Sequence, residues 1–362
     1  MIDIYSQREI TTRSKEHILQ NELGGKLQSA ELIDKETNDC LGSTIDADLG
    51  RALHWIRVQL SATSGDGVLP SKMSVQTPEA RYNILPGGKP ERGKPQISVV
   101  KDSENHVVKI SGYARSEQEL RTLTKRILEK YSITEETFRE SIEHRSEFLK
   151  PFDIDFELTP STLRGVAKIA CNLLALHDKV LFLRDDFNPI RRFIYRGTGD
   201  IAQFVHINTS SVLIGENGRN LGQLDHLIVV QGTTTTGHVR ALVCLFKHLQ
   251  FIVTLGTVSL DKDFVYTYRV DQLGKQYRMN DPKDFFPIPS RYQQKHFERT
   301  LKRAVGSIND VINSRKPNIL EQITQQATVD IFGSHDESNA NITQEDMDRL
   351  RERIIEYLLQ AG

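Results

Sequence analysis

The most constraining feature of the sequence is a block of short apolar segments between about residues 190 and 290. β-branched and aromatic residues dominate these runs, which glycines separate: RRFIYRG, FVHINTSSVLIG, LDHLIVVQG, VRALVCLFKHLQFIVTLG and DFVYTYRV. Such runs favour strands, and the glycines favour chain reversals. The preceding segment 159–177 has a buried helical pattern, with Thr159 or Ser161 available as its cap. The sequence therefore predicts an α+β fold, with a mostly antiparallel sheet packed on this helix.

The length of 362 residues is too great for one ordinary hydrophobic core and predicts two or three domains. Residues 1–62 have the pattern of a compact strand–loop–helix unit. Residues 63–95 are rich in Gly, Pro, Ser and Lys, which is typical of a linker or mobile loop. Residues 96–315 are expected to form a larger α+β domain that recognises substrate or regulates activity, and residues 316–362 a helical tail.

Three local patterns refine this division. The segment QISVVKDSENHVVKISGYA predicts a β-hairpin around the polar DSEN turn. Two amphipathic helices are expected to follow, beginning at Ser116 and Thr134, and another near residues 291–314. Near the C-terminus, the segment QEDMDRLRERIIEYLL predicts a further helix. GENGRNLG (215–222) lacks the Lys-Ser/Thr of a phosphate-binding loop and is interpreted as a hairpin turn.

Composition restricts the class of protein. Hydrophobic residues make up 38% and charged residues 26%, which is typical of a globular chain. No apolar run is long enough to span a bilayer, and the N-terminal segment is too polar for a signal peptide, so a cytoplasmic protein is expected. Cys40, Cys171 and Cys244 form no CxxC pair, which favours neither a disulfide framework nor a zinc ribbon. The net charge of −1 argues against non-specific coating of nucleic acid, but a local basic face remains open.

Chemistry-bearing residues concentrate near the N-terminus. They are Ser14-Lys15-Glu16-His17-Ile18, then Leu23-Gly24-Gly25, then Asn38, Gly42 and Ile45-Asp46. Hydrolysis of a phosphodiester needs a base for water and a cation for the negative charge on the leaving oxygen. A neutral imidazole suits the first task, while carboxylate and amide oxygens suit Mg²⁺. Because adjacent strand residues point to opposite sides, Glu16 and His17 could meet one metal only with the help of a twist or bulge.

Residues 14–60 resemble the HNH endonuclease family, in particular its bacterial branch with the pattern EHI…LGG…CxxCN…G..ID. The matching pieces here are SKEHILQNELGG, KLQSAELIDKETND and CLGSTIDADLGRAL. The resemblance implies a small ββα-metal fold around one Mg²⁺ or Mn²⁺ ion. It implies that His17 is the general base, Glu16 the metal-binding acid and Asn38 the other metal ligand.

The chain departs from the family pattern at two places. Asp34 and Thr37 replace the two cysteines before the Asn, so no structural zinc is expected. The family's middle Asn, which orients the catalytic His, has no counterpart; Glu31 occupies its position and is the candidate orienting residue.

Each piece also has an ordinary structural interpretation. An EH pair is usually a solvated strand end, LGG a turn, and an Asn before a helix an N-cap. His206, His226, His238 and His248 lie in or beside strand-like runs, where structural histidines are more common than a metal site. Basic clusters are candidates for phosphate contacts, although such charges are more often merely solvated. They comprise Arg191, Arg192, Arg196, Lys295, Arg299, Lys302 and Arg303.

These observations lead to one main expectation and two alternatives. The first is a metal-dependent HNH-type DNA endonuclease, which by family analogy would serve bacterial restriction or phage defence, alone, as a homo-oligomer or with a partner protein. The second is a degenerate HNH-fold protein that binds DNA without cutting it. The third is a regulator whose sheet senses a small ligand and whose HNH similarity is accidental.

Overall fold

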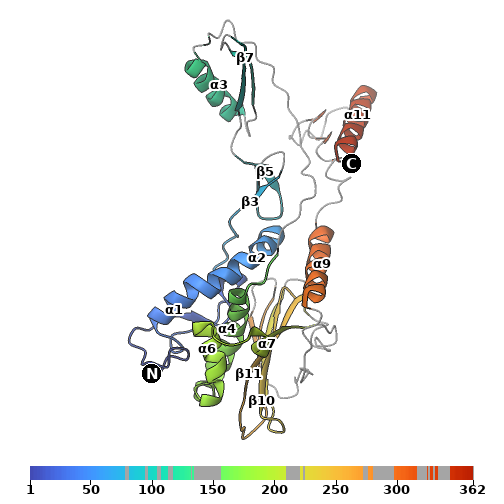
Figure 1. Cartoon of the computed structure of the whole chain (residues 1–362). Coiled ribbons are helices and arrows are strands. Elements are labelled where there is room, and N and C mark those ends of the chain that lie inside the picture. The colour runs from blue at the N-terminus through green and yellow to red at the C-terminus, as the bar shows by residue number, and fades with distance from the viewer. Residues whose placement is uncertain are drawn as a thin grey trace. The chain divides into compact units, whose positions relative to one another are not determined.

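The computed structural model describes most of the chain (Figure 1). The described residues are 1–77, 81–93, 97–103, 107–112, 117–131, 133, 156–208, 221–222, 225–271, 276–279, 297–315, 324, 327–328, 331–332 and 343–361. The chain divides into two compact units. Unit 1 comprises Met1–Ser71, Pro86–Gly88 and Asp155–Arg315; unit 2 comprises Lys72–Leu85, Lys89–Ile154 and Lys316–Gly362.

Unit 1 begins with a very short hairpin. Strands β1 (Glu16–His17) and β2 (Gln28–Ser29) pair antiparallel, with the 3-10 turn η1 (Asn21–Leu23) between them. Gly24 ends this turn at φ 87°, a left-handed conformation that glycine adopts without a Cβ clash. A Cβ on Gly25 would lie 1.8 Å from the Leu19 carbonyl oxygen, so only glycine fits there. The LGG sequence thus closes the hairpin by its backbone conformation.

A nearly continuous helix follows the hairpin. Helix α1 (Lys35–Leu41) starts at Asp34, whose carboxylate accepts the backbone N–H of Glu36. A π-helical turn, η2 (Gly42–Asp46), leads directly into α2 (Ala47–Leu60). Beside this turn, the hydroxyls of Ser43 and Thr44 donate to carbonyls four residues earlier, at 2.8 and 2.7 Å. Hydroxyls that bond back in this way compete with the helical backbone pattern, which accounts for the local widening.

Helix α4 (Pro160–His177) is the centre of unit 1. Its N-terminus is capped by the Thr159 hydroxyl, which accepts the N–H of Thr162, and Pro160 occupies the first turn. Nearly every residue from Thr162 to Ala175 is buried, because α4 contacts both α2 and the sheet strands β9 to β12. Short helices follow: α5 (Lys179–Phe182), η3 (Asp185–Phe187), α6 (Asn188–Arg196) and α7 (Ile201–Phe204).

A six-stranded sheet forms the rest of unit 1, with strand order β13-β12-β9-β10-β11-β8 and antiparallel pairing throughout. Helix α9 (Phe297–Arg315) contacts β8, β11 and α2. The strands are β8 (Val205–Ile207), β9 (His226–Gly232), β10 (His238–Leu245), β11 (Leu249–Thr257), β12 (Phe264–Val270) and β13 (Gln276–Met279).

Unit 2 contains smaller elements. A three-stranded antiparallel sheet consists of β3 (Met73–Gln76), β4 (Arg81–Ile84) and β5 (Pro90–Arg92). A separate hairpin joins β6 (Ile97–Lys101) and β7 (Val107–Gly112). Its described helices include α3 (Glu117–Tyr131) and α11 (Gln344–Ala361).

The α+β class is confirmed, and so is the antiparallel sheet packed on the helix expected at 159–177. The hairpin QISVVKDSENHVVKISGYA is present as β6 and β7. The helix expected from Thr134 and residues 215–220 of the expected turn lie outside the described residues.

The expectation of a strand at RRFIYRG is wrong, because this segment belongs to α6. Its apolar residues Ile190, Phe193 and Ile194 follow helical spacing and are all buried. Pro189 in the first turn and Gly197 at φ 68° after the last provide a helical start and stop. A short apolar run of this kind is ambiguous between strand and helix until its flanking residues are weighed.

The units do not divide where the sequence suggested. Residues 1–71 belong to one unit with residues 155–315, with no boundary at residue 62. The physical reason is the apolar face of α2, whose Leu49 packs against α4 at Gly165. The segment 63–95, expected to be a linker, contains β3, β4 and β5.

Candidate functional site

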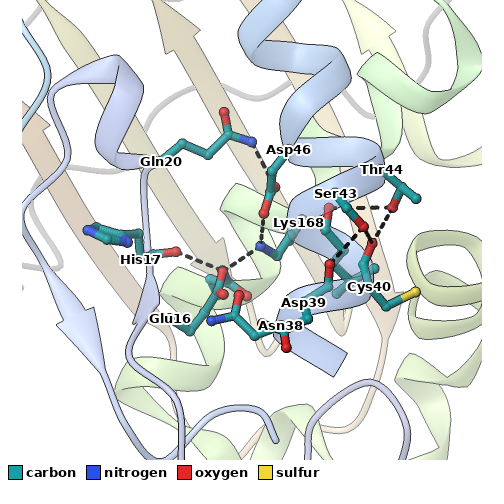
Figure 2. A network of polar contacts seen from close by, with 12 residues as sticks. Glu16, His17, Gln20, Asn38, Asp39, Cys40, Ser43, Thr44, Asp46 and Lys168 are labelled. Atoms are coloured by element: carbon teal, nitrogen blue, oxygen red, sulfur yellow. Dashed lines mark hydrogen bonds and ion pairs between the residues drawn. The ribbon is translucent and has the colours of Figure 1, made fainter. Parts of the chain in front are cut away.

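Glu16 and His17 lie side by side in β1, but their side chains have different surroundings. Glu16 is 2% exposed, whereas His17 is half-buried. Figure 2 shows the His17 ring directed away from the Glu16 carboxylate, as the alternation of a strand requires. No twist or bulge brings the two groups together.

The Glu16 carboxylate is held by two residues of α4. Lys168 Nζ and Asn172 Nδ2 each lie 2.6 Å from Glu16 Oε1. Lys168 Nζ also lies 2.5 Å from Asp46 Oδ2, in η2, as Figure 2 shows. Glu16, Asp46, Lys168 and Asn172 are called the Glu16 network below. Two further residues support it: Gln20 Nε2 donates to Asp46 at 2.8 Å, and the Tyr5 hydroxyl donates to Asn172 Oδ1 at 2.7 Å.

The electrostatics of the network follow from its composition of two carboxylates around one ammonium group. Burial raises the pKa of Glu16, and the charge of Lys168 acts in the opposite direction. Burial alone would lower the pKa of Lys168, but Glu16 and Asp46 together raise it above its usual value. Lys168 therefore stays protonated at neutral pH and serves as the cation of the network.

His17 meets a residue of the neighbouring strand. Gln28, its register partner in β2, places Nε2 at 2.6 Å from His17 Nε2. With the Gln28 amide in this orientation its nitrogen donates, so His17 Nε2 accepts and the ring proton of the neutral imidazole is on Nδ1. Burial lowers the pKa of His17, so the imidazole is neutral near pH 7. That protonation state is the one a general base requires.

Asn38, the other residue expected to bind metal, lies in α1 and is half-buried. Its Nδ2 donates to Ser14 Oγ at 2.7 Å. This bond ties the helix to the segment just before β1. Asn38 is therefore not the N-cap of the helix, a role that Asp34 takes.

The residues present do not fit a divalent ion on Glu16. The Glu16 carboxylate is buried and already bonded to an ammonium group and an amide. A metal ion there would meet the positive charge of Lys168 at close range. Within the described ranges, no three His, Cys, Asp or Glu side chains gather in a group that could hold a metal ion.

The expected orienting role of Glu31 finds no support in its contacts. Glu31 is exposed, its backbone N–H donates to Ser29 Oγ, and its carbonyl accepts from Lys179. The contact to the His17 ring comes from Gln28 instead. The sequence could not reveal this, because strands of two residues carry no periodic signal from which their register can be predicted.

The basic candidates separate into buried and exposed side chains. Arg191 is 1% exposed, and its guanidinium donates to the carbonyls of Phe182 and Arg184 and to Asn188 Oδ1. It belongs to the core, so its expected phosphate contact is wrong. Lys295 lies outside the described residues. Five candidates are exposed on helices of unit 1, namely Arg192 and Arg196 on α6 and Arg299, Lys302 and Arg303 on α9.

The four histidines of the sheet region do not form a cluster that could bind metal, as far as the structure describes them. His226 is buried in β9 and accepts a long hydrogen bond, 3.5 Å, from the Phe246 N–H. His238 Nδ1 lies 2.9 Å from the Thr257 hydroxyl. Burial lowers the pKa of His206 and of His248. These are the properties of structural histidines.

Lys168 and Asn172 were not among the site residues predicted from the sequence. Both lie in the apolar helix 160–177, four residues apart and hence on one face. A lysine inside a buried helix requires an anionic partner, and this was the available signal. Its partner Glu16 is 152 residues away in sequence, a pairing that no local pattern reveals.

Comparison with known proteins adds no assignment: no protein-family model matches the chain, and no curated protein is significantly similar to it. Among the helices that the structure describes, none has the length and apolar character to cross a membrane.

Proposed function

We propose that this chain is an HNH-like protein that binds DNA in the cytoplasm without cutting it through a divalent ion. The observation that carries this proposal is the Glu16 network. The carboxylate that the resemblance assigns to metal is bonded to Lys168 and Asn172 and is inaccessible to solvent. The HNH resemblance supports DNA as the ligand, and so do the exposed arginines and lysines of α6 and α9.

The basic residues have a suitable arrangement for phosphate contacts. Arg192 and Arg196 are four residues apart on α6 and share one face of that helix. Arg299, Lys302 and Arg303 likewise have i, i+3 and i, i+4 spacing on α9. Arginine and lysine side chains bound to phosphate release counterions, so we expect affinity that falls steeply with salt.

A second candidate, the HNH endonuclease, is favoured by His17. Its ring is accessible in part and burial lowers its pKa, so the imidazole is neutral, and the attacking water would have to replace the Gln28 amide at Nε2. In this candidate His17 takes the proton from the water that attacks the phosphodiester. Hairpin β1–β2 followed by α1 also has the order of the ββα pattern.

One experiment separates the candidates. The full chain is titrated into fluorescently labelled duplex DNA, and in parallel incubated with supercoiled plasmid, each with Mg²⁺, Mn²⁺ or EDTA. The proposal predicts that the duplex is bound in EDTA at least as well as in Mg²⁺ or Mn²⁺, which compete for the phosphates, and that the plasmid stays supercoiled. The double variant Arg192→Gln/Arg196→Gln should bind more weakly, while Lys35→Gln, at an exposed position of α1, serves as the control.

Two results would overturn the proposal. Metal-dependent nicking that His17→Ala abolishes would establish the endonuclease. Absence of both binding and nicking would remove DNA as the ligand and favour the alternative of a ligand-sensing regulator.

A further inference from the structure

The position of Lys168 Nζ in the Glu16 network is that of a bound cation. It lies between carboxylate oxygens of two different elements, at 2.6 Å from Glu16 in β1 and 2.5 Å from Asp46 in η2 (Figure 2). Its side chain is 3% exposed, so water contributes little to its neutralisation. The buried carboxylate of Glu16 and the part-buried one of Asp46, with one cation between them, would supply two of the roughly six to eight oxygen ligands that a calcium site uses, the others being water or backbone oxygens.

We propose that the Lys168 ammonium takes the place of a divalent cation in this site, and that shortening its side chain would create a calcium site on Glu16 and Asp46. This inference deepens the proposed function, because it explains why Glu16 has no divalent ion to offer to DNA. It concerns cation binding in the absence of DNA, so it can fail or hold independently of DNA binding.

The distances decide which ion suits the vacated position. The carboxylate oxygens lie 2.5 and 2.6 Å from the ammonium nitrogen. Ca²⁺–oxygen distances are about 2.3–2.6 Å, whereas Mg²⁺ requires about 2.0–2.1 Å and a near-ideal octahedron. Ca²⁺ can therefore use the two carboxylates where they stand, while Mg²⁺ would have to draw β1 and η2 together.

Space is the second requirement. Lys168→Ala removes both the charge and the side-chain stem, which leaves room for an ion and its waters. Lys168→Met removes the charge but fills the same space, so it is the matched control. Both substitutions keep a good helix former in α4. The double variant Glu16→Gln/Lys168→Ala has the room but only one carboxylate.

The test is isothermal titration of each full-length variant with CaCl₂ and with MgCl₂. Lys168→Ala should bind one Ca²⁺ at least about tenfold more tightly than the wild type, Lys168→Met or the double variant, and more tightly than it binds Mg²⁺. Equal binding by Lys168→Ala and Lys168→Met would overturn the inference. So would tight binding by the wild type that Glu16→Gln abolishes, because the lysine would then not exclude the ion.

A second measurement applies if Lys168→Ala does not fold in the absence of metal. Refolding from urea is compared in CaCl₂ and in EDTA for the same three variants. Calcium should raise the refolded yield of Lys168→Ala alone. An unchanged yield for Lys168→Ala would contradict the substitution of lysine for metal.

Discussion

Helix α4 has two sides that are stabilised in different ways. One side packs on the strands β9 to β12, and this part of the chain is rich in fully buried Leu, Ile and Ala. The other side meets β1, η2 and α2, where Lys168 and Asn172 bind Glu16 and Asp46. Apolar contacts tolerate small changes of position, but a buried ammonium group needs its partners at bonding distance. The polar side therefore fixes where the hairpin β1–β2 sits on the helix.

The largest effect is expected when the polar side of α4 is disrupted. Lys168→Met leaves the two carboxylates without their cation and should lower the free energy of unfolding by about 3–5 kcal/mol in urea denaturation at pH 7. Leu174→Ala on the same helix, fully buried, should cost about 2–5 kcal/mol through the lost contacts and the remaining cavity.

The double variant Glu16→Gln/Lys168→Met sharpens this comparison. It removes the charges of Glu16 and Lys168 and leaves only the part-exposed Asp46 without its cation, so it should be more stable than Lys168→Met alone, whereas no such recovery is available to Leu174→Ala. A double variant as unstable as the single one would mean that Lys168 stabilises by packing and not by its charge.

The next effect is a loss of folding stability in acid, which the protonation of His226 should cause. Burial lowers the pKa of His226 from 6.5 to about 3 in the folded chain. As pH falls below 6.5, the unfolded chain gains this proton and the folded chain does not, so stability is complete above 6.5 and declines toward about pH 3. The loss at pH 5 should be about 2 kcal/mol.

The control for this titration is His226→Gln, which does not ionise. Unfolding curves between pH 7 and pH 5 should show a smaller loss of stability for this variant than for the wild type. Identical pH dependence in both proteins would show that His226 is not protected from protonation in the folded state. His17→Gln, at the half-buried polar side, should change the profile less.

The smallest effect concerns two adjacent arginines of α6. Arg191→Leu leaves the buried carbonyl of Phe182 and two part-buried acceptors, on Arg184 and Asn188, without their donor and should lower stability by about 1–3 kcal/mol. Arg192→Leu, at an exposed position, should change stability by less than about 0.5 kcal/mol. If Arg192 contacts a phosphate, its loss should instead reduce the salt dependence of DNA binding by about one unit of slope. If Arg192→Leu lowered stability more than Arg191→Leu, the assignment of the buried and exposed faces of α6 would be wrong.

Elements that depend on neighbouring residues could be predicted from the sequence, whereas contacts between distant residues could not. Helix α4, the antiparallel sheet and the hairpin β6–β7 were predictable because periodicity and turn residues are local signals. The position of Glu16 and His17 at a strand also followed from local pattern, whereas the helix expected to start at Asn38 begins earlier, at Lys35. The partners of Glu16 and His17 did not follow from it: Lys168 and Asn172 reach Glu16 from far along the chain, and Gln28 meets His17 only through the register of a very short hairpin. The burial of Arg191 was missed because α6 was expected to be a strand.

The most direct test of this account is a crystal structure of the wild-type protein soaked in MnCl₂, with an anomalous difference map calculated at the Glu16 network. The account predicts no manganese peak beside the Glu16 carboxylate, and Lys168 Nζ still bonded to Glu16 and Asp46. A manganese ion on Glu16 with Lys168 displaced would contradict it and would restore the metal-dependent endonuclease as the better proposal.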